Sequence, residues 1–322
     1  MTTERVFELA GLHDPLSLCG HLDRNLGALE DLVPVSVSVD GDQIRLRGES
    51  TAVESAHAIL GRMLDAAKGG AQLTPDDVAL AARDTITERA EPGGETPRAL
   101  PKTLFVTQRG KEIRPKTDGQ RRLVDAIERH PLSFAIGPAG TGKTFLAIVM
   151  AVRALRDRQV QRIVLSRPAI EAGEKLGFLP GDLREKVDPY LRPLYDALGE
   201  VMDDGVVAKY LERGTIEVAP LAYMRGRTLA DAFIILDEAQ NATREQLKMF
   251  LTRIGPNSKM VVGGDVTQID LPRAIPSGMV DVPRLFGGID EIAIVELDEG
   301  DVVRNPLVAT IVAAYRRLDT TK

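Results

Sequence analysis

Tryptophan is absent from the 322 residues, aromatic residues make up only 4%, and Cys19 is the single cysteine. So few aromatic side chains argue against an extended surface on which nucleic-acid bases stack. One cysteine excludes an internal disulfide framework and any metal site built from several cysteines, which suits a reducing compartment. No apolar run approaches the roughly 20 residues that cross a bilayer, and the first five residues lack a signal-type apolar stretch. We therefore expect a cytoplasmic protein without a membrane partner.

Charge is the second constraint on function. The net charge of −6 at pH 7 argues against indiscriminate binding of nucleic acid by the whole surface. Any nucleic-acid site must therefore be a local patch. The length predicts about two domains, one of them large enough for a proper hydrophobic core.

Residues 137–144 fit the phosphate-binding pattern G-x-x-x-x-G-K-[ST]. The preceding apolar residues predict a short buried strand, and residues 144–152 predict a largely buried helix. Glycines at these positions let backbone N–H groups point inward, and the helix adds its positive N-terminal end. We therefore predict that a nucleoside triphosphate is bound by Gly137, Pro138, Ala139, Gly140, Thr141, Gly142, Lys143 and Thr144. Lys143 is also a predicted catalytic residue, and Thr144 is a predicted ligand of Mg²⁺.

Two carboxylates follow a second apolar run, residues 232–236, which predicts a buried strand ending beside the phosphates. In this Walker B pattern Asp237 would hold Mg²⁺ and Glu238 would polarise the attacking water. Plain surface acids fit badly, because a buried acidic pair without a cation is costly. A third strand at 260–264 leads to Gln268, which we predict to contact the γ-phosphate or its water, whereas Asp265 could simply cap a turn.

Gln120 opens a helix about 20 residues before this phosphate loop. The spacing resembles the Q-motif of helicases, in which a glutamine amide reads adenine. An amide offers one donor and one acceptor, which match adenine N6 and N7. Gln120 is therefore our candidate for the choice of ATP, and an ordinary glutamine on a helix surface is the alternative.

The first 70 residues predict a small α+β domain with the order strand, helix, strand, strand, helix. The first helix should begin at Asp14-Pro15 and carry one apolar stripe of Cys19, Leu22, Leu26 and Leu29. KH-like RNA-binding domains have this order, but their Gly-x-x-Gly loop does not occur in residues 1–68. This region holds six basic and eleven acidic residues, and Arg45 and Arg47 should share one face of its hairpin. RNA binding and a protein-interaction role therefore remain equal alternatives.

Residues 71–112 predict a connecting segment with a helix, a Pro- and Gly-rich linker at 91–97 and a short hairpin around Arg109. Residues 89–122 hold nine basic and four acidic residues, the most basic part of the chain. The segment could be a solvated linker or part of an RNA path.

Residues 113–322 alternate strands and helices, which predicts an α/β domain with a parallel sheet covered on both faces. The three motifs together resemble the RecA-like core of superfamily 1 helicases, which place the nucleotide between two such cores. Only about 210 residues are available here, enough for one core. Because the transition-state charge in phosphoryl transfer is often met by an arginine supplied in trans, we expect a homo-oligomer such as a hexameric ring.

Four segments, residues 166–182, 223–228, 236–241 and 264–272, closely resemble the PhoH family. The resemblance extends over most of residues 100–320, and the N-terminal module resembles that of the PhoH-like, YbeZ-type branch, without a PIN nuclease segment. It implies a bacterial ATPase linked to RNA metabolism, with a metal-dependent endoribonuclease of ribosomal RNA maturation as a partner.

The resemblance also suggests further site residues. Arg304 stands where the family carries a basic residue and is the arginine-finger candidate, with a surface ion pair as the alternative. Arg167 and Arg225, in loop-like stretches beside core strands, have similar standing. Glu174, Lys175 and the turn at 177–182 fall where superfamily 1 enzymes contact nucleic acid, and a structural turn is the rival interpretation.

Two classes of function follow. The first is an RNA-associated ATPase or helicase that uses Mg²⁺, and the second is a nucleotide-dependent switch or scaffold that binds a nuclease or ribosomal partner without unwinding RNA. The helicase-type motifs favour the first, whereas the acidic N-terminal module and the single core favour the second. A kinase of a small substrate shares the phosphate loop but lacks an evident acceptor site.

Overall fold

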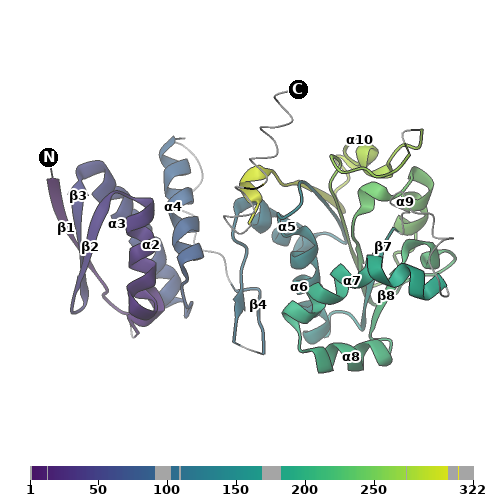
Figure 1. Ribbon diagram of the computed structural model, residues 1–322, viewed down its shortest axis with the longest axis horizontal. Helices are drawn as coiled ribbons and strands as arrows, with labels where there is room; N and C mark the ends of the chain where they lie inside the picture. Colours follow the sequence, from purple (N-terminus) through teal and green to yellow (C-terminus); the bar gives the residue numbers. More distant parts are fainter. Residues whose placement is uncertain are drawn as a thin grey trace. The chain divides into compact units, whose positions relative to one another are not determined.

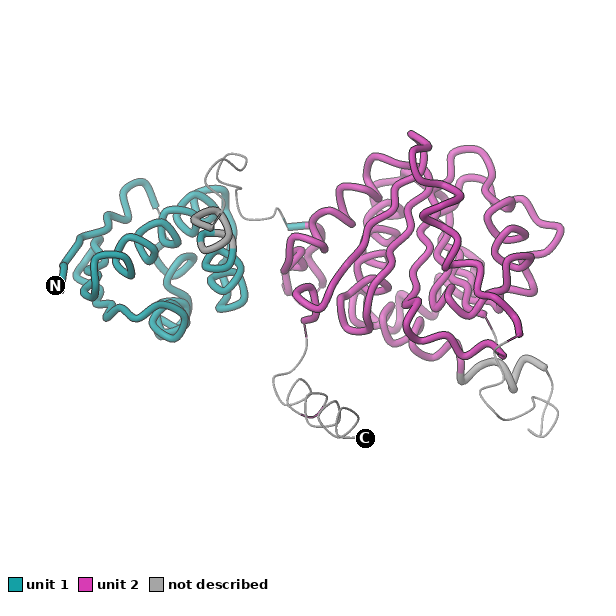
Figure 2. The backbone as a smooth tube through the Cα atoms, turned by 90° about the horizontal axis from the view of Figure 1, so that it is seen from above, with its two compact units in different colours: residues 1–103 teal, residues 104–322 magenta. Residues whose placement is uncertain are grey.

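The computed structural model describes residues 2–12, 14–90, 103–108, 110–168, 183–272, 274–303 and 311 (Figure 1). The chain forms two compact units, residues 1–103 (unit 1) and residues 104–322 (unit 2), which are coloured separately in Figure 2. Within the described ranges, no helix has both the length and the apolar character needed to cross a membrane.

Unit 1 is an antiparallel sheet with helices on one face (Figure 1). Its strands, in the spatial order β1-β3-β2, are β1 (Thr2–Glu8), β3 (Gln43–Glu49) and β2 (Val35–Asp40). Its helices are α1 (Leu16–Cys19), η1 (His21–Asp23), α2 (Arg24–Leu32), α3 (Ser50–Lys68) and α4 (Pro75–Ala90). Ile44 and Leu46 of β3 are fully buried against the helices, as the period-2 pattern of a half-buried strand requires.

The expected first helix is interrupted. Gly20 at φ 75° and Leu22 at φ 54° take left-handed backbone conformations, so α1 ends at Cys19 and α2 begins at Arg24, after four intervening residues. Leu22 is consequently 84% exposed, and its predicted place in the apolar stripe is wrong. Cys19, Leu26 and Leu29 are buried as predicted, because they lie on the helical turns either side of the break.

Helix α4 was expected in a connecting segment, and it instead belongs to the core of unit 1. Val78 and Ala81 are completely buried in the same apolar cluster as Leu60 of α3. The boundary between compact units consequently lies between Thr103 and Leu104. The expected linker at 91–97 lies outside the described residues.

The outer face of the unit 1 sheet carries Arg45 and Arg47, and both are paired with acids. Arg45 lies 2.9 Å from Asp40 and 3.8 Å from Glu4, and Arg47 lies 2.7 Å from Glu4. Exposed pairs of this kind contribute little to stability. The acidic partners nevertheless offset the positive charges of Arg45 and Arg47, which the sequence predicted to share this face.

Unit 2 is built on a six-stranded parallel sheet covered on both faces. In spatial order its strands are β11 (Ile292–Glu296), β6 (Leu132–Ile136), β10 (Lys259–Gly264), β9 (Ala232–Leu236), β7 (Arg162–Arg167) and β8 (Ile216–Pro220). Its α-helices are α5 (Asp118–Arg129), α6 (Lys143–Arg156), α7 (Leu183–Val201), α8 (Asp204–Glu212), α9 (Arg244–Leu251) and α10 (Val282–Phe286). Short 3₁₀ turns are η3 (Leu221–Met224), η4 (Ala239–Asn241), η5 (Gly278–Asp281) and η6 (Glu299–Asp301). The predicted α/β fold with a parallel sheet is confirmed.

Successive residues of each strand enter opposite cores. Ala135 of β6 packs in the cluster that contains α5, α6, α7 and α8, whereas Phe134 and Ile136 pack in the cluster that contains α9 and α10. The hairpin of β4 (Phe105–Val106) and β5 (Glu112–Ile113) joins the first cluster through Phe105 and Ile113, so it belongs to unit 2.

Parallel pairing aligns the carboxyl ends of the strands at one edge of the sheet. Gly264 pairs with Ile136, and Leu236 pairs with both Val262 and Ser166. The loops that follow β6, β7, β9 and β10 therefore meet at this edge, which is where open α/β sheets bind ligands.

Candidate nucleotide site

The phosphate-binding loop connects β6 to the first turn of α6. Gly140 at φ 87° and Gly142 at φ 82° adopt conformations that side chains rarely tolerate, so glycine is required at both. Gly137 is needed for space, because a Cβ there would lie 2.5 Å from the carbonyl oxygen of Leu297. This tight loop directs the N-terminus of α6 towards the carboxyl edge of the sheet, where it favours an anion.

Lys143 and Thr144 begin α6 and point in different directions from it. The Lys143 ammonium donates to the carbonyl oxygens of Gly137, at 2.6 Å, and Pro138, at 2.8 Å. The Thr144 hydroxyl donates to Asp237 Oδ1 at 2.6 Å. Lys143 thus stabilises the conformation of the phosphate loop, and Thr144 links the loop to Asp237 at the end of β9.

Asp237 directly follows β9 and is 7% exposed. Burial raises the pKa of this carboxyl above its usual range, and the hydrogen bond from Thr144 and the charge of Arg167 oppose that rise. Its carboxylate and the Thr144 hydroxyl are oxygen ligands of the kind Mg²⁺ prefers, so the pair fits a bound magnesium ion. A cation at this position would also favour the ionised form of the buried acid.

Glu238 follows with φ 52°, a left-handed conformation that turns its side chain away from the strand. Its Oε1 lies 3.3 Å from Arg167 Nη2, and its Oε2 accepts a hydrogen bond of 2.5 Å from Gln240 Nε2. Both carboxylate oxygens therefore have partners on opposite sides of the site.

Gln240 is 1% exposed and links the loops that follow β9 and β10. Besides Glu238, its Nε2 donates to the carbonyl oxygen of Gln268 at 3.2 Å, and its Oε1 accepts from the Asp265 backbone N–H at 3.0 Å. Asn241 adds a parallel connection, because its Oδ1 accepts from the Asp270 N–H at 2.8 Å. Sequence reasoning missed this link, although polar residues after a buried strand were the available signal.

Asp265 caps the turn after β10 and also faces the site. Its Oδ1 accepts from the Thr267 N–H at 3.0 Å and from the Thr267 hydroxyl at 2.6 Å. Its Oδ2 is buried and has no hydrogen-bond partner among the described residues. The turn places Gln268 at the wall of the same cavity.

Arg167 is the last residue of β7, immediately beside Asp237 in the sheet. Its Nε lies 4.0 Å from Asp237 Oδ2, and its Nη1 donates to the carbonyl oxygen of Tyr190 in α7 at 3.2 Å. The sequence suggested an arginine finger acting on another subunit, whereas the structure directs this side chain into its own site.

A cavity of about 570 Å³ joins these groups. Its walls are formed by Ala139, Gly140, Gly142, Lys143, Thr144, Phe145, Arg167, Pro193, Asp196, Ala197, Glu200, Asp237, Glu238, Gly264, Asp265 and Gln268. The contribution of α7 through Asp196 and Glu200 was missed at the sequence level, because no motif marks that helix. The structure thus brings the predicted phosphate loop, acidic pair and Gln268 around one cavity.

Gln120 lies behind the phosphate loop and does not line that cavity. The side chain is 5% exposed. Its Oε1 accepts from the Lys116 N–H at 2.6 Å, and its Nε2 donates to the Thr141 carbonyl oxygen at 3.0 Å. Both polar atoms are therefore bound to backbone, and the predicted contact with adenine would require both bonds to break.

The segment that follows β11 also reaches the phosphate-binding loop. The Val303 N–H donates to the Gly140 carbonyl oxygen at 3.0 Å, and Asp301 Oδ1 accepts from the Gly119 N–H at 3.0 Å. A Cβ at Gly119 would clash with Asp301 Oδ2, so a larger residue there would displace this carboxylate. Arg304 follows Val303 and lies outside the described residues.

The remaining sequence candidates fall into two groups, one outside the described residues and one away from the cavity. Glu174, Lys175 and the turn at 177–182 lie outside the described residues, and Arg225 is exposed and does not line the cavity. In the basic stretch 89–122, Arg121 lies 3.1 Å from Asp118, and Arg114 is paired with Glu112. The described part of that stretch is thus partly neutralised.

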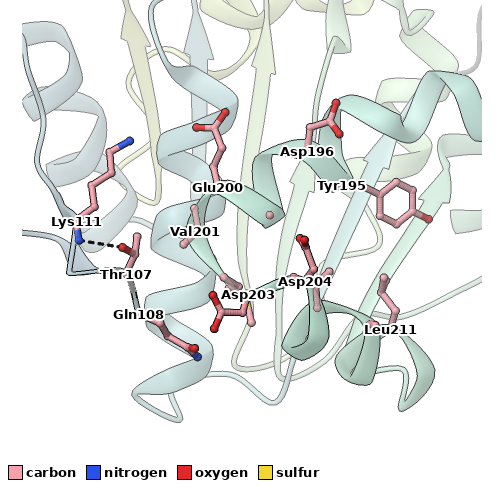
Figure 3. A pocket seen from close by; sticks show the side chains of 14 residues that line it. Thr107, Gln108, Lys111, Tyr195, Asp196, Glu200, Val201, Asp203, Asp204 and Leu211 are labelled. Atoms are coloured by element: carbon pink, nitrogen blue, oxygen red, sulfur yellow. Dashed lines mark hydrogen bonds between the residues drawn. The ribbon is translucent and has the colours of Figure 1, made fainter.

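A second cavity of about 1010 Å³ lies between the β4–β5 hairpin and the α7–α8 corner (Figure 3). Asp203, Asp204 and Lys111 line it, together with Asp196 and Glu200, which also border the nucleotide cavity. Helix α7 is consequently the shared wall of the two cavities. The preponderance of carboxylates makes the second one a poor path for RNA.

Comparison with known proteins agrees with this geometry. A sequence model of the PhoH-like protein family matches residues 112–316. This chain belongs to the PhoH-like protein family. It is 51% identical over 304 residues to a PhoH-like protein of Mycobacterium tuberculosis strain H37Rv, covering 94% of this chain and 85% of the relative. It is 48% identical over 302 residues to a PhoH-like protein of Bacillus subtilis, covering 94% of each.

Among solved structures, the PhoH-like chain is similar to the Pif1 helicase from Candida albicans at 12% identity. The match covers 56% of this chain and 39% of the helicase, with a TM-score of 0.27. A score this low carries no argument. The P-loop assignment of the PhoH-like protein therefore depends on the family match and on the residues around the cavity.

Proposed function

We propose that this PhoH-like protein hydrolyses ATP with Mg²⁺ and that hydrolysis is coupled to RNA metabolism. One observation supports the ATPase assignment above all others. Lys143 and Thr144 at the start of α6, and Asp237 and Glu238 after β9, come from two separate chain segments and border a single cavity of about 570 Å³. These are the groups that phosphoryl transfer to water requires for phosphate binding, metal binding and orientation of the nucleophile.

The division of roles follows from the contacts. The backbone N–H groups of residues 137–144 and the Lys143 ammonium would bind phosphate oxygens, and Thr144 with Asp237 would hold Mg²⁺, which supplies charge neutralisation when bound. Glu238, with both carboxylate oxygens already oriented by neighbours, would accept a proton from the attacking water. Gln268 lines the same cavity and would sense the terminal phosphate.

The coupling to RNA and the partners depend on the resemblance and remain part of the proposal. We propose a homo-oligomer, an RNA substrate and an endoribonuclease of ribosomal RNA maturation as a partner. The helicase-type motifs after β9 and β10 support a motor, because Gln240 connects the carboxylate that would activate water to the loop carrying Gln268.

A specific observation in unit 1 supports the alternative of a switch or scaffold. The connection between α1 and α2 has the sequence Gly20-His21-Leu22-Asp23. It has an aspartate where the Gly-x-x-Gly loop of KH-like domains has its second glycine, and its Leu22 is 84% exposed. An exposed leucine beside a carboxylate suits contact with a protein better than a clamp on a phosphate backbone.

The rate of ATP hydrolysis, with and without single-stranded RNA and at several salt concentrations, separates the two functions. Coupling predicts a stimulation that is largest at low salt and declines as salt competes for phosphate contacts. Heparin serves as the control for charge alone, and it should not stimulate. Normal basal turnover without RNA stimulation at low salt would favour the scaffold, and absent basal turnover would refute the ATPase.

A further inference from the structure

Arg167 occupies a position that neither the phosphate loop nor the Walker B motif specifies. Register alone places it there, since Ser166 pairs with Leu236 and the Asp237 N–H donates to the Ser166 carbonyl oxygen at 2.9 Å. The next residue on each strand then faces the same edge of the sheet. Arg167 therefore borders the same cavity as Lys143, and β10 and β9 lie between β7 and β6, the strand that leads into the phosphate loop.

The guanidinium is held by three groups. It approaches Glu238 at 3.3 Å and Asp237 at 4.0 Å, and it donates to the Tyr190 carbonyl oxygen at 3.2 Å. The side chain is 21% exposed, so these charges interact in a medium less polar than bulk water. Two carboxylates that face one cavity require such a positive charge nearby.

Bound Mg²⁺ and ATP would change this balance of charges. Asp237 would then be compensated by the metal that it holds with Thr144, and the guanidinium would face the terminal phosphate as a further acceptor. A guanidinium is planar, always charged and able to donate two parallel hydrogen bonds, which suits phosphate oxygens well. Lys143, bound to the carbonyl oxygens of Gly137 and Pro138, lines the same cavity.

We propose that Arg167 is a cis ligand of the γ-phosphate and makes the site discriminate ATP from ADP. This inference rests on the proposed function, because it requires a nucleoside triphosphate in the cavity. It supplies within one chain the positive charge for which the sequence suggested a neighbouring subunit. Arg167 is accordingly a catalytic residue whose partner in the nucleotide-free site is Glu238.

The test compares the affinities of the full chain for Mg²⁺–ADP and for a non-hydrolysable ATP analogue with an imido bridge, by calorimetry. Arg167→Ala should weaken binding of the analogue about 10- to 100-fold, the usual effect of losing hydrogen bonds to a charged group, and change ADP affinity by about twofold or less. Arg167→Lys should fall between. Arg162→Ala, at the other end of the same strand, is the matched control and should alter neither affinity.

Equal weakening of both nucleotides, or of neither, would overturn the proposal and make Arg167 a strut between β7 and α7. Retained ADP binding in Arg167→Ala reports that the variant is folded. Failure of the proposed function gives a different result, because the unaltered protein would then bind neither nucleotide.

A mixing experiment tests whether Arg167 acts within its own chain. Arg167→Ala protein, mixed with Lys143→Ala protein under conditions that allow subunit exchange, should show no more turnover than the two proteins measured separately. If Arg167 acts within its own chain, the intact Arg167 of the Lys143→Ala protein cannot reach the site of the Arg167→Ala protein. Neither chain then has a complete site. Recovery of turnover in the mixture would overturn the cis assignment.

Discussion

The two units bury polar side chains for different purposes. In unit 1 the buried Asn25 donates to the carbonyl oxygens of Leu18 and Leu73, at 2.7 and 3.0 Å, and thereby links α1 to the segment before α4 across a closed core. In unit 2 buried polar groups such as Asp237 and Asp265 gather at one edge of the sheet and line a cavity. A buried polar side chain alone therefore does not indicate a functional site. Several buried polar side chains that line one cavity do.

If the nucleotide site lies in unit 2, the largest loss of ATP turnover is expected for Lys143→Ala. Loss of the ammonium that faces the phosphates should lower ATP turnover by about 10³-fold or more. Steady-state ATPase assays measure it, and far-UV circular dichroism should show an unchanged fold. Turnover close to that of the unaltered protein would contradict the assignment of the nucleotide site to unit 2.

Glu238→Gln should reduce kcat by about 10²- to 10⁴-fold, because the amide cannot accept the proton of the attacking water. Nucleotide binding should remain, since Glu238 is not part of the phosphate loop. Turnover and equilibrium binding of the ATP analogue are measured on the same preparation. Equal loss of both would show that Glu238 serves the fold, as Asn25 does in unit 1.

Substitution of one buried and one exposed leucine tests how the core of unit 1 is packed. Leu29→Ala removes a fully buried side chain and should lower the free energy of unfolding of unit 1 by about 2–5 kcal/mol. Leu22→Ala, 84% exposed, should change it by less than about 0.5 kcal/mol. Urea unfolding followed by circular dichroism measures both. A comparable loss in the two variants would contradict the break between α1 and α2.

The smallest expected effect concerns Cys19. Burial raises the pKa of its thiol to about 11, so the thiolate is scarce at pH 8 and alkylation by iodoacetamide should be slow until unit 1 unfolds. The unfolded thiol ionises near pH 8.5. The contribution of Cys19 to stability is therefore present below that pH and is lost as the pH rises towards 11. Rapid alkylation of the folded protein at pH 8 would contradict the burial.

Local motifs made the phosphate loop and the acidic pair predictable, because their residues are adjacent in the chain and their chemistry fixes their order. The directions of Gln120 and Arg167 were not predictable, since each depends on which segment lies beside it in the fold. The break at Leu22 escaped the helical pattern because a left-handed backbone leaves no mark in apolar spacing. The strand order of unit 2 likewise follows from pairing that residue patterns do not encode.

The contacts of Gln120 and Val303 with the phosphate loop limit how far unit 2 can be truncated. Gln120 of α5 donates to the Thr141 carbonyl oxygen, and Val303, two residues after η6, donates to the Gly140 carbonyl oxygen. Shortening unit 2 from either end would thus disturb the loop before it exposed the sheet. Tension on the chain at residue 303 would likewise be transmitted directly to the phosphate-binding loop.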